Sequence, residues 1–340
     1  MVLVTLTACT RGAANTGSSP NQVYAAGPTE SDIRSLLGSG DWWESTPSFG
    51  VRPLGLPQMS ESVKFSITDR FIHVGTSEFF VAQYIVYTST SGATAEMTSI
   101  SNNFPNAPTT PKAGDQAIYS GEKTAGKSSL YSNLAFVRVG QTIIAIQWNR
   151  NQGFSDANTL AKIGSKLANK LKDVSSGKVK PSPVSSSDTH LLPAAGTDVT
   201  LVGVARLPVE AAAASLGLGE PQQLVNAFHQ LGVKDFVFGD YALNADLTME
   251  VRAYVFSFST PDDATSWLDA MVGGSSNLDA NGIAAGYSSS AGFYYAFFSG
   301  GTHGAMLFCS AIDPFTTAAR ACEAPMGDII GAWQLSLQQA

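Results

Sequence analysis

The feature that most constrains how this chain can fold is an internal repeat. Residues 83–90 (QYIVYTST) resemble residues 253–260 (AYVFSFST) when Tyr84 is aligned with Tyr254. Both segments are rich in aromatic and β-branched side chains, which favours strands, and each leads into a short amphipathic stretch. The repeat indicates that the same unit is built twice along the chain.

The elements that follow the repeated strand occur in the same order in both halves. In the first half we expect a helix at 91–100, strands at 116–121, 130–139 and 141–148, and a closing helix at 156–174; in the second half we expect a helix at 261–272, strands at 282–288, 292–299 and 305–309, and a closing helix at 316–337. Thr260 and Pro261 are typical of an N-cap and a first helical residue. This order predicts two related α+β domains, each an antiparallel sheet with helices packed on one face. Chance recurrence of a common α+β pattern is the alternative.

Stretches rich in Ser, Gly and Pro separate these parts of the chain. We predict a signal remnant at 1–9, a flexible tether at 10–28, a first domain at 29–175, a linker at 176–194 and a second domain at 195–340. Helical lead-ins are expected at the start of each domain, at 29–37 in the first and at 208–216 and 221–231 in the second.

The chain opens with an apolar segment that ends in Leu6-Thr7-Ala8-Cys9. This pattern resembles the lipobox of bacterial lipoproteins. The resemblance implies a diacylglycerol on the Cys9 thiol and a place on the extracytoplasmic face of the cell membrane. No Lys or Arg precedes Cys9, so the charged start of a complete signal peptide is missing. An ordinary apolar N-terminus with a chance cysteine is the alternative.

Two further cysteines, Cys309 and Cys322, lie near the C-terminus. In an exported protein such a pair is expected to form a disulfide. Two buried free thiols are the alternative.

The lipobox, the polar tether, the paired domains and the late cysteine pair are together similar to secreted actinobacterial lipoproteins. The plan also loosely resembles extracellular sensor domains of bacterial serine/threonine kinases. This resemblance covers architecture and implies no functional residue.

The net charge of −7 argues against nucleic-acid binding, which needs a concentrated basic surface. The charge is uneven, since residues 1–180 carry 16 Lys and Arg against 12 Asp and Glu, and residues 181–340 carry 4 against 15. The four histidines show no pair at helical metal-binding spacing, and no catalytic motif is present. We therefore predict a non-enzymatic protein without a cofactor that binds a small molecule or protein partner through its domain interface. A cell-envelope hydrolase and a purely structural surface protein, docked by opposite charge, are the alternatives.

Three groups of side chains are candidates for contacts with partners. Adjacent tryptophans, Trp42 and Trp43, could stack on a ligand. In the aromatic run 292–299, alternation places Phe293, Tyr295 and Phe297 on one face and Tyr294 and Phe298 on the other, so both faces of this strand need cover. Of these we select Tyr294 and Phe298 as candidate binding residues. A lysine stripe on one helix face, Lys162, Lys166 and Lys170, is a candidate contact with an anionic surface.

Overall fold

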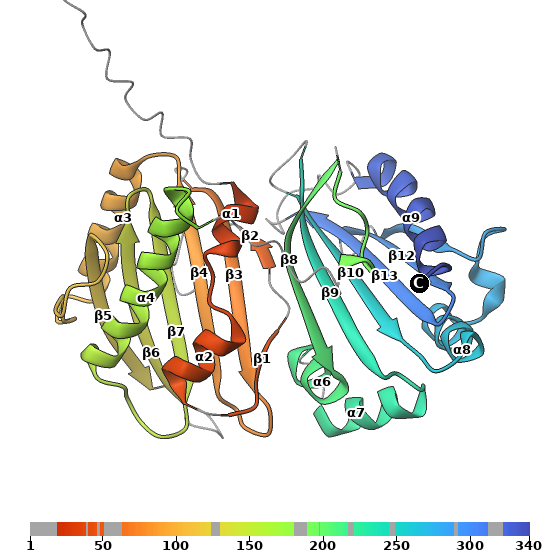
Figure 1. Cartoon of the computed structure of the whole chain (residues 1–340), viewed down its shortest axis with the longest axis horizontal. Helices are drawn as coiled ribbons and strands as arrows, with labels where there is room; N and C mark the ends of the chain where they lie inside the picture. The colour runs from red at the N-terminus through yellow and green to blue at the C-terminus, as the bar shows by residue number, and fades with distance from the viewer. Residues whose placement is uncertain are drawn as a thin grey trace, which may run out of the picture.

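The computed structural model describes residues 19–38, 40–45, 48–50, 63–123, 130–179, 189–196, 198–216, 221–244, 249–288, 292–311 and 322–340. The chain forms two antiparallel sheets that stand side by side, each with its own helices (Figure 1). The N-terminal half forms one sheet and the C-terminal half forms the other, as the colour gradient shows. Cys9 and its lipobox lie outside the described residues.

The first sheet has the strand order β1-β3-β4-β7-β6-β5, and β2 also pairs with β3. Its strands are β1 (Trp42–Glu44), β2 (Ser48–Gly50), β3 (Val63–His73), β4 (Phe79–Tyr87), β5 (Gln116–Lys123), β6 (Tyr131–Val139) and β7 (Thr142–Arg150). Its helices are α1 (Pro20–Ala25), α2 (Glu30–Leu37), α3 (Thr90–Asn103) and α4 (Ala157–Ser175).

The second sheet has the order β11-β12-β13-β10-β9-β8. Its strands are β8 (Val199–Pro208), β9 (Asp235–Leu243), β10 (Met249–Ser257), β11 (Ala284–Ser288), β12 (Phe293–Gly300) and β13 (His303–Ala311). Its helices are α6 (Val209–Leu216), α7 (Pro221–Gln230), α8 (Pro261–Val272) and α9 (Glu323–Leu337), with a 3₁₀ turn, η1, at Ser275–Asn277.

The two sheets repeat one topology. The order β3-β4-β7-β6-β5 corresponds to β9-β10-β13-β12-β11, with α3 and α8 after the first hairpin and α4 and α9 at the end. The prediction of two α+β domains built on antiparallel sheets is confirmed. As expected, α8 runs from Pro261 to Val272, because the Thr260 side chain accepts a hydrogen bond from the Asp263 amide.

The alignment of the repeat, however, is wrong by one residue. Tyr84 packs in the cluster under α4, and its counterpart under α9 is Val255. Ile85 packs on the opposite face under α3, and its counterpart under α8 is Phe256. Because strand side chains alternate between faces, aligning Tyr84 with Tyr254 exchanges the two faces of the sheet.

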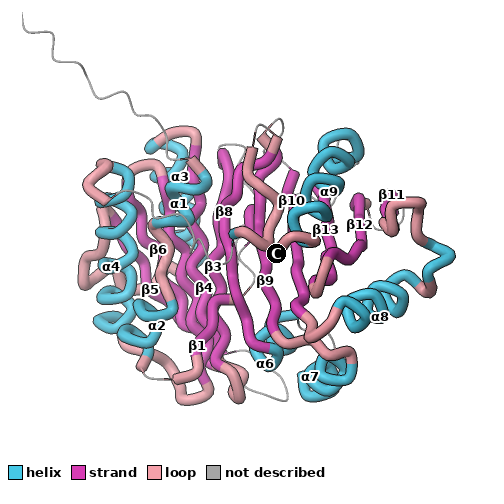
Figure 2. The backbone as a smooth tube through the Cα atoms, turned by 45° about the vertical axis from the view of Figure 1, so that its right-hand side comes forward, coloured by secondary structure: helices cyan, strands magenta, loops and turns pink. Residues whose placement is uncertain are grey.

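The helices also lie on both faces of each sheet, where one face was expected. In the first domain, α4 and α1 cover one face and α3 covers the other. In the second domain, α9 covers one face and the helices α6 to α8 cover the other (Figure 2). The reason is visible in β4, whose residues from Phe80 to Tyr87 are all buried, so the strand needs apolar cover on both sides.

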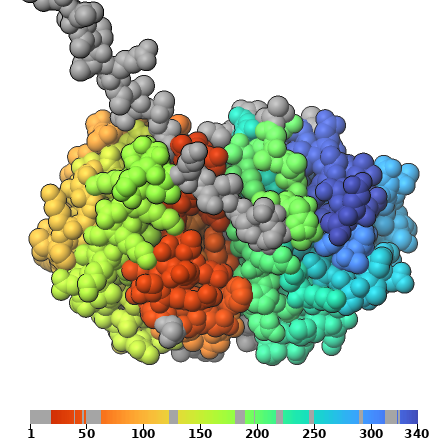
Figure 3. All heavy atoms as spheres, viewed as in Figure 1, coloured from red at the N-terminus to blue at the C-terminus, as the bar shows by residue number. Residues whose placement is uncertain are grey.

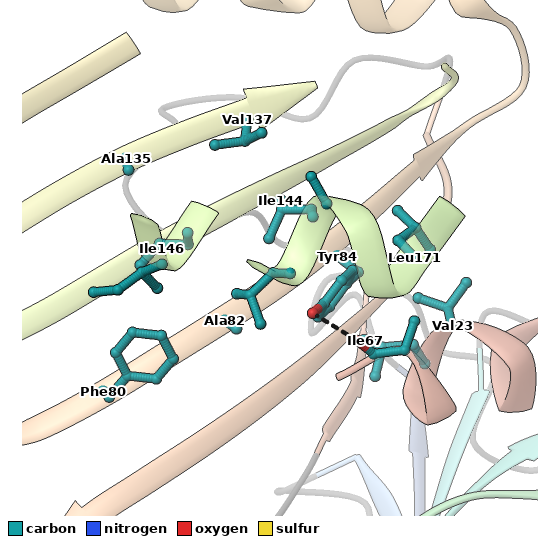
Figure 4. Close-up of a cluster of buried hydrophobic side chains, with 14 of the residues drawn as sticks. Val23, Ile67, Phe80, Ala82, Tyr84, Ala135, Val137, Ile144, Ile146 and Leu171 are labelled. Carbon is teal, nitrogen blue, oxygen red and sulfur yellow. Dashed lines mark hydrogen bonds between the residues drawn. The ribbon is translucent and has the colours of Figure 1, made fainter. Parts of the chain in front are cut away.

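Residues 19–28, predicted as part of a flexible tether, instead form α1 and pack on the first sheet. Val23 is fully buried among the side chains of β3, β4 and α4 (Figure 4). The Tyr84 hydroxyl in the same cluster donates to the Ala26 carbonyl at 3.2 Å. An apolar residue within a polar stretch therefore ties this segment to the core.

Part of the predicted linker is likewise built into the second domain. Leu191 and Leu192 are buried in the core beneath α9. Trp333 of α9 donates its indole N–H to the Leu191 carbonyl at 2.8 Å. Ordered structure of the second domain thus begins before residue 195.

No helix in the described part of the chain is long and apolar enough to cross a membrane.

Candidate functional site

The two domains meet along the edge strands of their sheets. β1 and β8 each lie at the end of a strand order, and both lie at the boundary between the domains. Apolar side chains cross this boundary, since Ile72 of the first domain packs in the cluster of Leu207 and Phe236 of the second. The interface is therefore a continuous packed contact.

Polar contacts between described residues also join the domains. The Tyr24 hydroxyl contacts the Val204 backbone, at 3.1 Å from its carbonyl oxygen and 3.3 Å from its nitrogen. The buried hydroxyls of Ser45 and Ser215 share a hydrogen bond. A third contact connects β2 to β10, where the Phe49 amide donates to a carboxylate oxygen of Glu250 at 3.1 Å.

Opposite net charge does not hold the domains together through ion pairs between described residues. The ion pairs that these residues form join groups of the same domain, as in Lys166–Asp32 at 2.9 Å and Arg206–Asp235 at 2.6 Å. The alternative in which charge docks the two halves gains no support from these contacts.

A groove of about 910 Å³ runs along the boundary between the domains. In Figure 3 the red surface of α1 and α2 meets the green surface of β8 and α6 along this boundary. Residues from α1, α2 and β1 form one wall, and residues from β8 and the start of β9 form the other. Its volume lies in the range of small-molecule sites, which are common between domains.

Most charged groups in the groove are neutralised by each other. Arg34 pairs with Glu30 at 3.2 Å on one wall. Arg206 and Asp235 form their pair on the opposite wall. These pairs leave the walls close to neutral and fix the side chains in place.

Lys234 differs from these residues. Its side chain is exposed, it lines the groove, and it makes no ion pair with a described residue. Trp43 lines the groove too, with its indole N–H donated to Asp41 at 2.8 Å. The groove thus offers an aromatic ring, apolar side chains such as Leu207, and one uncompensated positive charge.

The floor of the groove holds a partly buried carboxyl group. The Tyr24 hydroxyl lies 2.9 Å from a carboxyl oxygen of Glu44, in addition to its contacts with Val204. Burial and the nearby charge of Asp69 raise the pKa of Glu44 well above its usual range. Burial likewise raises the pKa of Tyr24, so the phenol keeps its proton.

Asp69 of β3 lies beneath this floor and is almost fully buried, at 1% exposed. Neither of its carboxyl oxygens has a hydrogen-bond partner among the described residues. Burial raises the pKa of Asp69, and the positive charge of Lys170 lowers it in part. The carboxyl group reaches so close to Gly27 that a Cβ added there would lie 2.1 Å from Asp69 Oδ2.

A second buried acid lies on the second sheet. Asp240 is fully buried, and burial and the neighbouring Glu250 raise its pKa. Arg252, directly opposite Asp240 on β10, pairs with Glu250 at 2.7 Å. Glu250 in turn accepts the hydrogen bond from Phe49 described above. Each domain therefore places a buried aspartate and a glutamate at the interface.

The structure separates the two predicted tryptophans. Trp43 lines the groove, whereas Trp42 is 2% exposed and stacks on His73 with ring centroids 4.8 Å apart. Trp42 therefore belongs to the packing of the sheet edge.

The aromatic strand β12 also differs from the prediction. Tyr294 and Phe298, the candidate binding residues, lie in the core under α9, where Phe298 contacts Trp333 at 5.0 Å between ring centroids. The opposite face, with Phe293 and Tyr295, stays partly exposed. Sequence alternation separates the two faces correctly but contains no signal for which one the last helix covers.

The lysine stripe on α4 is divided as well. Lys166 and Lys170 pair with Asp32 of α2 at 2.9 and 3.3 Å, and Lys170 also donates to the Gly27 carbonyl. Lys162 is exposed to solvent and forms no ion pair with a described residue. Two of the three lysines therefore bind the N-terminal segment of their own chain.

Cys309 and Cys322 are joined by a disulfide, with Cα atoms 6.1 Å apart. Both are fully buried in the core under α9. Within the described residues, no group of three or more His, Cys, Asp or Glu side chains is arranged to hold a metal ion.

Sequence reasoning missed Tyr24, Glu44 and Asp69. A signal for Asp69 was present, because Phe65, Ile67 and Phe71 alternate with it on one face of a strand. An acid within an alternating apolar series is a buried acid, and buried acids are concentrated at functional sites. Tyr24 had no such signal, since it lies in a polar stretch.

No known protein family matches the sequence, and no curated protein matches it. Among solved structures, the extracellular domain of PknH from Mycobacterium tuberculosis is 11% identical with a TM-score of 0.38, over 46% of this chain and 97% of that one. The di-domain ARO/CYC StfQ from the steffimycin biosynthetic pathway is 8% identical with a TM-score of 0.21, over 94% and 93%. Likenesses at this level assign no function to the groove.

Proposed function

We propose that this chain is a non-enzymatic extracytoplasmic lipoprotein that binds a small amphipathic anion in the groove between its domains. The observation that carries the proposal is the groove itself, about 910 Å³ in volume, with Trp43 and Leu207 beside Lys234, which forms no ion pair with a described residue. An apolar body packed on the ring and a carboxylate or sulfonate at the ammonium would use both features.

Binding is favoured over catalysis by the state of the polar groups. The polar groups of the walls are engaged with each other, as in Arg34–Glu30 and Arg206–Asp235. The Tyr24 hydroxyl contacts the Glu44 carboxyl group, but burial raises the pKa of Tyr24, which keeps the phenol protonated and makes it a weak nucleophile.

The proposed anchor is Cys9, on the strength of the lipobox pattern. Lipid attachment there would hold the domains at the membrane surface through residues 10–18. If Cys9→Ala leaves the membrane fractionation of the precursor unchanged, the anchor is excluded.

The groove can be tested with anilinonaphthalene sulfonate, a fluorescent amphipathic anion. We expect one molecule to bind per chain, with at least about tenfold weaker binding in Trp43→Ala, since one ring contact and its buried area account for about 1.4 kcal/mol or more. Lys234→Gln should weaken binding as well. Lys162→Gln, which removes an exposed lysine away from the groove, is the matched control. Equal affinity in all three variants would place the probe elsewhere.

An envelope hydrolase is the second candidate, because Glu44 lines the groove and its raised pKa suits a general acid. Incubation with esters and glycosides that fit the groove would distinguish the two. A hydrolase would release product from one of these substrates, whereas a binding protein would retain them unchanged.

A further inference from the structure

At the contact between α1 and β8, the hydroxyl of Tyr24 faces two oxygen acceptors but carries only one proton. Tyr24 Oη lies 2.9 Å from a carboxyl oxygen of Glu44 and 3.1 Å from the Val204 carbonyl oxygen. A phenol has one proton and can donate it to one acceptor. If Glu44 is ionised, one of these two contacts is a pair of oxygens without a proton between them.

Protonation of Glu44 removes the conflict. The acid then donates to Tyr24 Oη, and Tyr24 donates to the Val204 carbonyl. The Val204 amide, 3.3 Å away, donates to the second lone pair of Tyr24 Oη. Every contact then has one proton, and β8 is bonded through both backbone groups of Val204.

We propose that Glu44, Tyr24 and Val204 form a proton-operated latch, closed when Glu44 is protonated and released when Glu44 ionises, that joins the two walls of the interdomain groove and limits how far they separate. The regulatory part of this inference rests on the proposed function of the groove. The latch itself rests on the contacts alone.

The groups that face Glu44 from the neighbouring elements favour the protonated acid on balance. Asp69 on β3 and Glu30 on α2 add negative charge, while Lys170 on α4 adds one positive charge. Lys170 is already shared with Asp32 and the Gly27 carbonyl. Arg34 on α2 is engaged by Glu30.

On β8, across the groove, Arg206 is engaged by Asp235. The remaining neighbour is the phenol of Tyr24, whose hydrogen bond lowers the pKa of Glu44 in part but does not outweigh burial and the charge of Asp69. No arginine or lysine in the described part of the chain pairs directly with Glu44.

The sign of the pH effect follows from burial. The pKa of Glu44 is raised in the closed state, so closure is complete below the ordinary carboxyl pKa and is lost as the pH rises through the raised value. The two walls of the groove are therefore bonded to each other through Val204 in acid and are released from each other in more alkaline solution. For one proton, the ratio of open to closed latch changes by at most about tenfold per pH unit.

Residue-resolved hydrogen exchange on the full chain without ligand tests the latch. We expect the protection factor of the Val204 amide to fall by up to about tenfold per pH unit between about pH 5 and pH 9, after correction for intrinsic exchange. The Gly239 amide, in the central strand β9 beside Val204, is the internal control and should keep its protection.

Two variants should fix the latch in opposite states. In Glu44→Gln the amide donates to Tyr24 as the acid does, so Val204 should stay protected at every pH. In Tyr24→Phe the hydroxyl is gone, so Val204 should be unprotected at every pH. Lys162→Gln, which removes an exposed lysine away from the groove, should retain the pH dependence of the wild type. An unchanged profile in Tyr24→Phe would overturn the latch, and this test holds even if Glu44→Gln does not fold.

The latch and the proposed function can fail separately. Protection of Val204 that is independent of pH in the wild type excludes the latch, even if the groove binds anilinonaphthalene sulfonate. Failure of the probe to bind at any pH would exclude an anion-binding groove, while a pH-dependent Val204 amide would still establish the latch.

Discussion

The two domains share a topology, and in each of them a segment that precedes the sheet packs on it: residues 26–27 in the first domain and residues 191–193 in the second. The domains differ in the side chains beneath these segments. In both, a side chain of the last helix donates to a carbonyl of this segment: Lys170 to Gly27 in the first domain and Trp333 to Leu191 in the second. A tyrosine hydroxyl of the sheet also donates to the segment in both, from Tyr84 to Ala26 and from Tyr241 to Pro193.

The contact between this segment and the sheet is polar in the first domain and apolar in the second. The first domain buries Asp69 against Gly27. At the corresponding place on β9 the second domain has Gly239, and Leu192 fills the space above it. Since the second domain forms this contact without an acid, the fold does not require one. In the first domain the charge of this acid acts on Glu44 of the proposed latch.

The largest expected loss of stability comes from removing the contact between Trp333 and the segment at residue 191 in the second domain. Trp333→Ala loses a buried ring, its contact with Phe298 and the bond to Leu191, so the second domain should lose about 3–5 kcal/mol of unfolding free energy. Lys170→Ala removes a partly exposed side chain and should cost the first domain about 1–2 kcal/mol. Hydrogen exchange in each domain measures both values, and equal losses would contradict the comparison.

The disulfide is the next feature that the domains do not share. Replacing both Cys309 and Cys322 by Ser opens a bridge that spans 13 positions, which should cost about 3 kcal/mol. The loss should be confined to the second domain, because both cysteines lie in its core. Thermal unfolding monitored separately in each sheet would show this, and an equal loss in both sheets would mean that the domains unfold as one unit.

Asp69→Asn should make the unfolding free energy of the first domain less dependent on pH. The raised pKa of Asp69 means that its protonated form stabilises the fold in acid and that this stability is lost as the pH rises through the raised value. The wild type should therefore lose up to about 1.4 kcal/mol per pH unit in that window, and the variant should not. Urea titrations across the pH range measure the slope. Identical slopes in both proteins would show that Asp69 does not titrate.

Asp32 should show the opposite and smaller dependence. Its pKa is lowered to about 2: burial raises it, but the Thr29 amide and the ammonium groups of Lys166 and Lys170 outweigh that effect. The stability it contributes is present above its ordinary pKa and is lost as the pH falls through about 2. Because the group is partly exposed to solvent, which screens its ion pairs, Asp32→Asn should cost about 1 kcal/mol at neutral pH. Lys162→Gln on the same helix face as Lys166 should change stability by less than about 0.5 kcal/mol, as the control.

Much of the fold followed from local sequence signals. α8 begins and ends where Thr260, Pro261 and the apolar spacing placed it, and the strands β5 to β7 follow their aromatic and β-branched runs. The edge strand β8 was not predicted, because a run such as Val199–Pro208 carries no alternation that separates it from a loop.

The groove could not be predicted, because it forms between segments that are distant in sequence. Tyr24 and Val204 are 180 positions apart, and nothing near either residue indicates the other. Trp43 was identified from its residue type alone, and the same reasoning selected Trp42, which is buried. Residue type indicates which side chains can bind, while the packing of β1 against β3 decides which one reaches the groove.

The meeting of β1 and β8 at the domain boundary has a consequence for each half of the chain on its own. A bare strand edge invites pairing with other molecules and so promotes aggregation. In this protein each domain shields the inner edge of the other, and α1 covers part of β8 through Tyr24. Neither half could then stand alone without exposing an unpaired strand edge, so each domain is expected to stay free of aggregation only in the presence of the other.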